Sequence, residues 1–205
     1  HGIGRRQRQM CIRDRSLSAH KFQGPRGIGA LVMPKPLPLK PQLLGGGQEA
    51  GLRSGTESPW LVAAMVDALE LRCQQQPLLA QAMATLRDEL WQRLSSVAGL
   101  NRIGTWGATD RLPHHLAVLL TSAHGEPLSA RAAVRQLAQA GVAVSSGSAC
   151  SSGKDQPNPA LMALGYNPRQ ARSGLRFSVG PWLDVHDLEP LPALMESVLS
   201  QLPAV

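Results

Sequence analysis

His20 and Lys21 stand side by side and are followed at once by the turn-forming run Gly24-Pro25-Arg26-Gly27-Ile28-Gly29. Glycine and proline favour tight turns, and glycine lets the backbone approach a ligand closely. An imidazole moves protons near neutral pH, and a deprotonated lysine amine attacks carbonyl groups. The apolar residues 28–33 then predict a short buried strand. The pair is therefore expected where a loop meets a sheet, as reactive groups or, alternatively, as a solvated loop lysine with a structural histidine.

A second stretch, Ser145-Ser146-Gly147-Ser148-Ala149-Cys150, favours chemistry over that alternative. Its serines and glycine place Cys150 in a polar loop, where the thiolate fraction of an accessible thiol is a strong nucleophile. Cys73, on a predicted helix with apolar neighbours, is expected to be buried and inert. Three widely spaced cysteines without a C-x-x-C motif argue against a disulfide framework or a zinc site.

Arg176 alternates with apolar residues on a predicted strand, residues 175–179, so either face of that strand could hold it. A guanidinium fork matches a carboxylate with two parallel hydrogen bonds, although a surface salt bridge is the alternative. His114 and His115 look like metal ligands, but adjacent residues of a strand point to opposite faces. No metal site is therefore predicted.

Four motifs occur in order: S-x-H-K-x-x-G-P-x-G-x-G at 18–29, G-G-G-x-E-x-G-L-R-S-G-T at 45–56, S-S-G-S-A-C at 145–150 and G-L-R-F-S-V-G at 174–180. Together they closely resemble the NifS/IscS-type cysteine desulfurases, within the class V aminotransferase group of pyridoxal-phosphate enzymes. The resemblance covers residues 16–202. It implies an α/β chain of the aspartate aminotransferase-like fold type I, with residues 16–80 as the end of the large cofactor-binding domain and 81–205 as the small α+β domain.

The resemblance also implies the cofactor contacts. Lys21 would hold pyridoxal 5′-phosphate covalently and take the substrate Cα proton, with His20 beside it. Ser18 would bind the cofactor phosphate. Thr56 would reach the phosphate of the partner subunit, which implies a homodimer.

For the reaction, the resemblance implies conversion of L-cysteine to L-alanine. Cys150 would take the sulfur as a persulfide for iron–sulfur cluster or nucleotide-thiolation pathways, and Arg176 would bind the substrate carboxylate. A sulfur-acceptor or iron–sulfur scaffold protein would be a partner. The family usually has Asn where His114 follows Pro113, which weakens any role carried over to that position.

Two other interpretations stay open. A related pyridoxal-phosphate lyase or aminotransferase of the same fold would not use Cys150. A non-catalytic sulfur-carrier module would keep Cys150 without binding the cofactor, and the presence of Lys21 argues against it.

The net charge of +7 does not indicate nucleic-acid binding, because residues 1–15 hold five arginines and one aspartate and so carry +4 of it. This basic segment resembles an artefact of sequence assembly, with a genuine basic arm as the alternative, and in either case it is left out of the fold prediction. No apolar run is long enough to span a membrane, and residues 1–15 lack the apolar centre of a signal peptide. A cytoplasmic protein without membrane contact is expected.

Residue patterns predict the other elements. The prolines of 34–41 indicate an extended connection. Helices are predicted at 58–75, with a core stripe from Trp60 to Leu69, and at 79–98 around a stripe of leucines. The remainder predicts strands at 116–121 and 142–145, and helices at 129–140, 158–164, near Arg169 and at 187–202.

In the family, a histidine that stacks on the cofactor ring and an aspartate that pairs with its nitrogen lie well before the S-x-H-K motif. Only residues 1–15 precede Ser16 here, so the sequence is expected to be a carboxy-terminal fragment. Expressed as written, it should bind pyridoxal phosphate poorly, show no turnover and aggregate through unburied apolar faces in residues 16–80, while residues from 81 onward fold alone.

Overall fold

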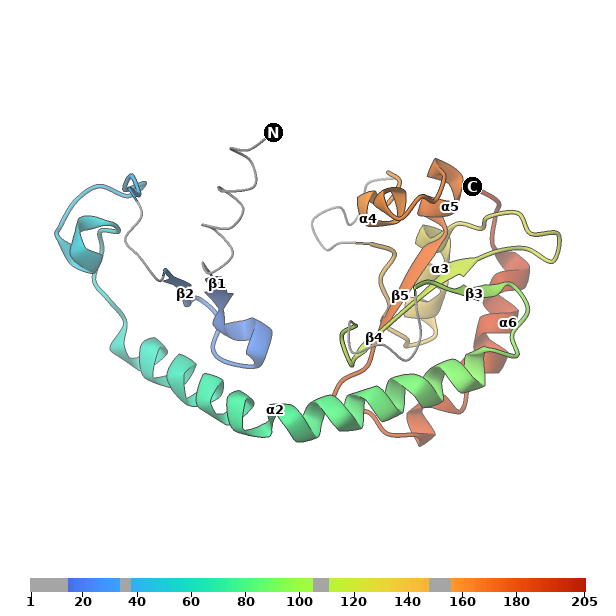
Figure 1. Cartoon of the computed structure of the whole chain (residues 1–205), viewed down its shortest axis with the longest axis horizontal. Coiled ribbons are helices and arrows are strands. Elements are labelled where there is room, and N and C mark those ends of the chain that lie inside the picture. Colours follow the sequence, from blue (N-terminus) through green and yellow to red (C-terminus); the bar gives the residue numbers. More distant parts are fainter. Residues whose placement is uncertain (1–14, 34–37, 105–110, 148–155) are drawn as a thin grey trace. The chain divides into compact units, whose positions relative to one another are not determined.

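The computed structural model describes residues 15–33, 38–104, 111–147 and 156–205 (Figure 1). The chain divides into two compact units, with the boundary between Gln76 and Pro77. Helix α2, Pro59–Leu94, contains this point of division. Among the residues described, no helix is both long and apolar enough to cross a membrane.

The first unit holds an antiparallel pair of strands, β1 (Arg15–Ser18) and β2 (Gly29–Val32), joined through the short 3-10 helix η1 (Ala19–Phe22). The register pairs Ser18 with Gly29, where a Cβ would lie 2.4 Å from the Leu17 carbonyl oxygen. Only glycine fits at that close approach. The expectation of a buried strand here is wrong, because all four β2 residues are exposed.

Apolar side chains of the first unit lie largely in solvent. Trp60 is 84% exposed and Leu44 83%, whereas Met65 is buried. The core stripe predicted from Trp60 to Leu69 is therefore mostly wrong, and the expected unburied apolar faces of residues 16–80 are confirmed. Cys73 is an exposed free thiol, not a buried one, because the surrounding half of α2 has little packed against it.

Two helices predicted at 58–75 and 79–98 are in fact the single 36-residue helix α2, with Pro77 inside it. Proline removes one helical hydrogen bond and crowds the preceding turn, which is why the sequence suggested a break. Leu86, Leu90 and Leu94 of its second half are buried, as the leucine stripe predicted.

The second unit is built on an antiparallel sheet of order β3 (Leu100–Arg102), β4 (His115–Leu120) and β5 (Gly174–Ser178). Among the described residues of this unit, the helices after α2 are α3 (Ala130–Gln139), α4 (Pro159–Ala163), α5 (Pro168–Arg172) and α6 (Leu191–Gln201), with the 3-10 turn η4 (His186–Leu188) before α6. The strand predicted at 142–145 is reduced to an isolated bridge between Ser145 and Arg176.

Local capping explains why α3, α4 and α5 begin where the sequence predicts. The Ser129 side chain accepts a hydrogen bond from the Ala132 N–H at 3.3 Å, and that of Asn158 accepts from Ala160 N–H at 2.9 Å. Asn167 and Gln170 form a reciprocal capping box at the start of α5. Among the described elements given above, the sequence pattern missed β1, β3 and η1, and the helix predicted at 187–202 begins only at Leu191.

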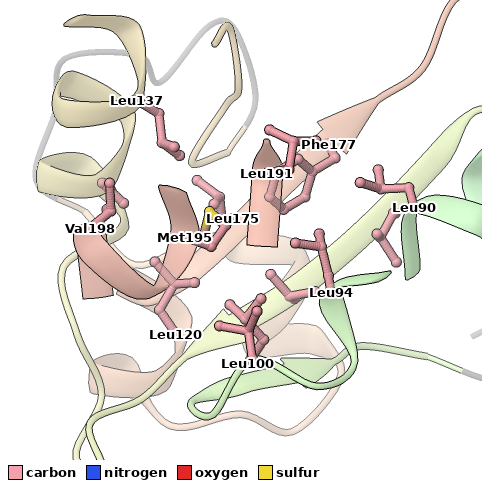
Figure 2. Close-up of a cluster of buried hydrophobic side chains, with 14 of the residues drawn as sticks. Leu90, Leu94, Leu100, Leu120, Leu137, Leu175, Phe177, Leu191, Met195 and Val198 are labelled. Carbon is pink, nitrogen blue, oxygen red and sulfur yellow. The ribbon is translucent and has the colours of Figure 1, made fainter. Parts of the chain in front are cut away.

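The main core of the second unit covers one face of the sheet (Figure 2). It joins Leu175 and Phe177 of β5 to Leu90 and Leu94 of α2 and to residues of α3 and α6. A smaller cluster, Ile103, Leu119, Leu161 and Ala171, packs α4 and α5 on the other face. The second unit thus carries its own layered core.

Candidate functional site

A cavity of about 290 Å³ lies in the second unit, between the sheet and helix α4. Its polar lining includes His115, Asn158 and Arg176. Apolar residues make the rest of its wall: Ile103, Ala117, Ala160, Leu161, Leu164 and Leu175. A charged group beside an apolar wall suits a small molecule that bears both an anionic group and a short apolar part.

The strand register places Arg176 in this cavity. Arg176 pairs directly with Ala117, which also lines the cavity, while the next residue Phe177 pairs with Leu116 and lies in the main core. The sequence did not predict on which face of the strand Arg176 lies. Because Phe177 packs into the main core, Arg176 lies on the opposite face. Arg176 Nε is buried and has no hydrogen-bond partner among the residues described. Such an atom is costly to bury alone, which favours binding of an anion here.

The chain on both sides of residues 148–155 borders the same cavity. Before this segment, Ser145 and Arg176 exchange two backbone hydrogen bonds, and Gly147 lines the cavity. After it, the Asn158 N–H donates to the Ala171 carbonyl at 3.1 Å. Cys150 itself lies outside the described residues, so its predicted role stays a prediction.

His115 shares the cavity with Arg176 and is half-buried. Burial lowers the pKa of the His115 imidazole, and the charges of Arg176 and Arg111, with His114 beside them, lower this pKa further. Sequence reasoning considered His115 only as a metal ligand and missed this placement. The available signal was strand alternation, because His115 lies two residues before Ala117 on the same face of β4. In the parts of the chain that the structure covers, no group of metal-ligating side chains forms a site.

Lys21 lies on the η1 turn between β1 and β2, together with Ser18 and His20, and all three residues are exposed. The Ala19 N–H donates to the Ile28 carbonyl at 3.1 Å, and the Gly24 N–H donates to the Ala19 carbonyl at 2.9 Å. These bonds close the turn. Arg72 of α2 donates to the Gln23 side chain and so ties the turn to the first half of the helix.

Thr56 is exposed in the loop that follows the 3-10 helix η2 (Gln48–Gly51). Glu49 and Ala50 both have positive φ, at 49° and 55°, a conformation that costs of order 1 kcal/mol or more for residues other than glycine. The Ser54 N–H donates to the Leu43 carbonyl at 3.3 Å and anchors the loop. Strain of this kind is often found where a loop serves a ligand.

The groups on the η1 turn fit a phosphate-bearing aldehyde cofactor. They combine an accessible primary amine, Lys21, with a hydroxyl, Ser18, on one tight turn, and Gly27 beside it leaves open space where a side chain would stand. The structure therefore groups the predicted residues in two places. Ser18, His20 and Lys21 lie together in the first unit, and Arg176 lies in the second.

Comparison with known proteins agrees with these features. The family model "Aminotransferase class-V" matches residues 15–191. The chain belongs to this family. The predicted fold of the chain is confirmed by the solved structure of a NifS-like protein from Rickettsia africae. The two sequences are 25% identical, and the structures align with a TM-score of 0.75 over 90% of this chain and 47% of that one. The family uses pyridoxal phosphate, which confirms the predicted cofactor class.

The names of two curated relatives state an enzymatic activity. A "Cysteine desulfurase" of Rhodobacter capsulatus is 34% identical over 187 residues, and a "Cysteine desulfurase IscS" of Colwellia psychrerythraea is 36% identical over 189 residues. These alignments cover 91% of this chain but only 47% and 45% of the relatives. The chain thus spans about half the length of the curated relatives it matches.

Proposed function

We propose that this chain carries the sulfur-accepting and carboxylate-binding part of a cysteine desulfurase. The observation that supports the proposal is the bridge between Ser145, which precedes Cys150 in the sequence, and Arg176, which lines the cavity. Sulfur transfer from an amino acid needs a nucleophilic thiol and a group that binds the carboxylate. The names of the curated relatives agree with this reaction.

Arg176 binds the carboxylate of L-cysteine through two parallel hydrogen bonds and holds the substrate in one orientation. The Cys150 thiolate then attacks the substrate sulfur. A sulfur–sulfur bond forms, the carbon–sulfur bond breaks with its electron pair left on carbon, and that carbon takes a proton to give L-alanine. The persulfide on Cys150 keeps the sulfur.

Lys21, with Ser18 and His20, holds pyridoxal phosphate in this proposal. When bound, the cofactor withdraws electrons from the substrate Cα. Lys21 Nζ takes the Cα proton, and a ring nitrogen of His20 donates or accepts a proton on the same turn. The Ser18 hydroxyl and the partner subunit's equivalent of the Thr56 loop bind phosphate, so the working form is a homodimer.

The persulfide passes to an acceptor or iron–sulfur scaffold protein, in keeping with the IscS name of one relative. The location is cytoplasmic.

The test uses a chimera in which the part of the Rhodobacter capsulatus relative outside the matched region is joined in front of Arg15. With pyridoxal phosphate and L-cysteine, we expect this protein to form alanine. Cys150→Ser should bind the cofactor normally but form no persulfide, and Cys73→Ser, the matched control on an exposed thiol, should behave as the unsubstituted protein does.

Lys21→Ala should abolish the visible absorbance of the bound cofactor, and Lys40→Ala, an exposed lysine of the same unit, should leave it unchanged. Alanine formation by the Cys150→Ser chimera at the unsubstituted rate would remove Cys150 from the reaction and favour a related lyase or aminotransferase.

A further inference from the structure

The cavity that Arg176 lines also contains the side chain of His115, which the proposed reaction does not use. His115 begins β4 and lines the cavity together with Arg176, whereas His114 does not line it. The backbone fixes His115 firmly. Its N–H donates to the Leu112 carbonyl at 3.3 Å, and its own carbonyl accepts from an Arg111 side-chain nitrogen, also at 3.3 Å.

The charges around His115 are almost all positive. Arg176 on β5 and Arg111 in the preceding turn act on it, and His114 is its neighbour in the chain. Helix α4, which closes the cavity, contributes no titratable side chain, since its residues are Pro159, Ala160, Leu161, Met162 and Ala163. Asp88 acts on Arg111 and is not among the groups that act on His115.

The positive charges around this cavity disfavour a further positive charge, so they favour the neutral form of the imidazole. A carboxylate that enters beside Arg176 reverses the local field, because it neutralises the guanidinium that opposes protonation of His115. The cavity has room for such a group beside its apolar wall, and the buried Nε of Arg176 lacks a partner among the described residues.

We propose that His115 is a second carboxylate-recognition residue, which takes up a proton from solvent when a carboxylate binds beside Arg176. The proposal rests on the carboxylate role of Arg176 in the proposed function. It makes substrate binding stronger as the pH falls, and it assigns a specificity role to a residue that none of the four sequence motifs contains.

The direction of the effect follows from linkage. Burial and the neighbouring positive charges hold the pKa of His115 below its usual 6.5, and a carboxylate bound beside Arg176 raises this pKa. Between the two values the bound state holds more protons, so the affinity rises as the pH falls, by up to about tenfold per pH unit. Above this window the affinity is constant.

The experiment titrates the 205-residue chain, at a concentration where light scattering detects no association, with sodium propionate, whose carboxylate and short apolar tail match the cavity. The carbon-bound imidazole protons are followed by NMR from about pH 8 to about pH 5.5, across the ordinary range of histidine titration. His115→Gln and His114→Gln assign the two resonances. We expect saturating propionate to raise the titration midpoint of His115 and to leave the midpoint of His114 unchanged within experimental error.

Propionate affinity supplies the second readout. It should rise as the pH falls in the unsubstituted chain and in His114→Gln, be independent of pH in His115→Gln, and be lost in Arg176→Ala. Binding that requires Arg176 without any shift of the His115 midpoint would overturn the role of His115 and leave the proposed carboxylate role of Arg176 intact. Equal binding by Arg176→Ala, or no binding to the unsubstituted chain, would instead remove both roles.

Discussion

Ser145 and Arg176 exchange a pair of backbone hydrogen bonds: the Ser145 N–H donates to the Arg176 carbonyl at 3.1 Å, and the Arg176 N–H donates to the Ser145 carbonyl at 2.7 Å. Because both bonds use only main-chain atoms, they hold the chain before Cys150 against β5 whatever the Arg176 side chain does. Loop attachment and carboxylate binding can therefore be separated by mutation.

Arg176→Ala should impair substrate binding and leave the loop attached. A charge-assisted hydrogen bond contributes about 1.5–3 kcal/mol, so KM for L-cysteine in the chimera should rise by roughly 10- to 100-fold. The absorbance of bound pyridoxal phosphate should not change, because Arg176 addresses the carboxylate and not the cofactor. Steady-state kinetics measures this effect, and a KM equal to that of the unsubstituted protein would exclude the proposed contact.

The second unit should fold without the first. Residues 77–205 contain the whole main core, including the half of α2 that supplies Leu86, Leu90 and Leu94. We expect this fragment to unfold cooperatively in urea. Leu94→Ala, at a fully buried position, should lower the free energy of unfolding by about 2–5 kcal/mol. Leu78→Ala, where the leucine is 75% exposed, should change it by about 0.5 kcal/mol or less. Non-cooperative melting of the fragment would contradict the assignment of the core.

The 205-residue chain should associate through its first unit. Trp60 and Leu44 are both more than four-fifths exposed, and apolar surface of this kind favours self-association. Trp60→Gln combined with Leu44→Gln should reduce both the binding of an apolar dye and the concentration-dependent light scattering. The control is Trp182→Gln, because Trp182 is 72% exposed but lies in the second unit. An equal effect of the control would show that the association is not specific to the first unit.

The sequence predicted the elements whose boundaries are set locally. Ser129 and Asn158 cap their helices within one turn, so residue type alone places α3 and α4. The sequence-based prediction failed where contacts with residues distant in the sequence determine the structure. Pro77 suggested a helix end, yet α2 continues through it, and Cys73 has apolar neighbours in sequence but is exposed in the structure.

The candidate site shows the same limit. The Lys21 turn and Arg176 strand follow from motifs, because each is a short continuous stretch. The cavity that joins His115 to Arg176 does not, since it depends on the register of β4 against β5 and on α4 as its cover. A residue such as His115, with an ordinary sequence context, gains a role only through that pairing.

The most direct test of the account is the fate of one sulfur atom. The chimera is loaded with pyridoxal phosphate, mixed with L-cysteine in the absence of any reductant, and quenched after a single turnover. Alanine is then quantified, and the peptide that carries each cysteine is weighed by mass spectrometry. We predict one alanine per protomer, with the mass of one additional sulfur atom on the Cys150 peptide and none on the Cys73 peptide. Alanine or another product formed while Cys150 keeps its original mass would contradict the account.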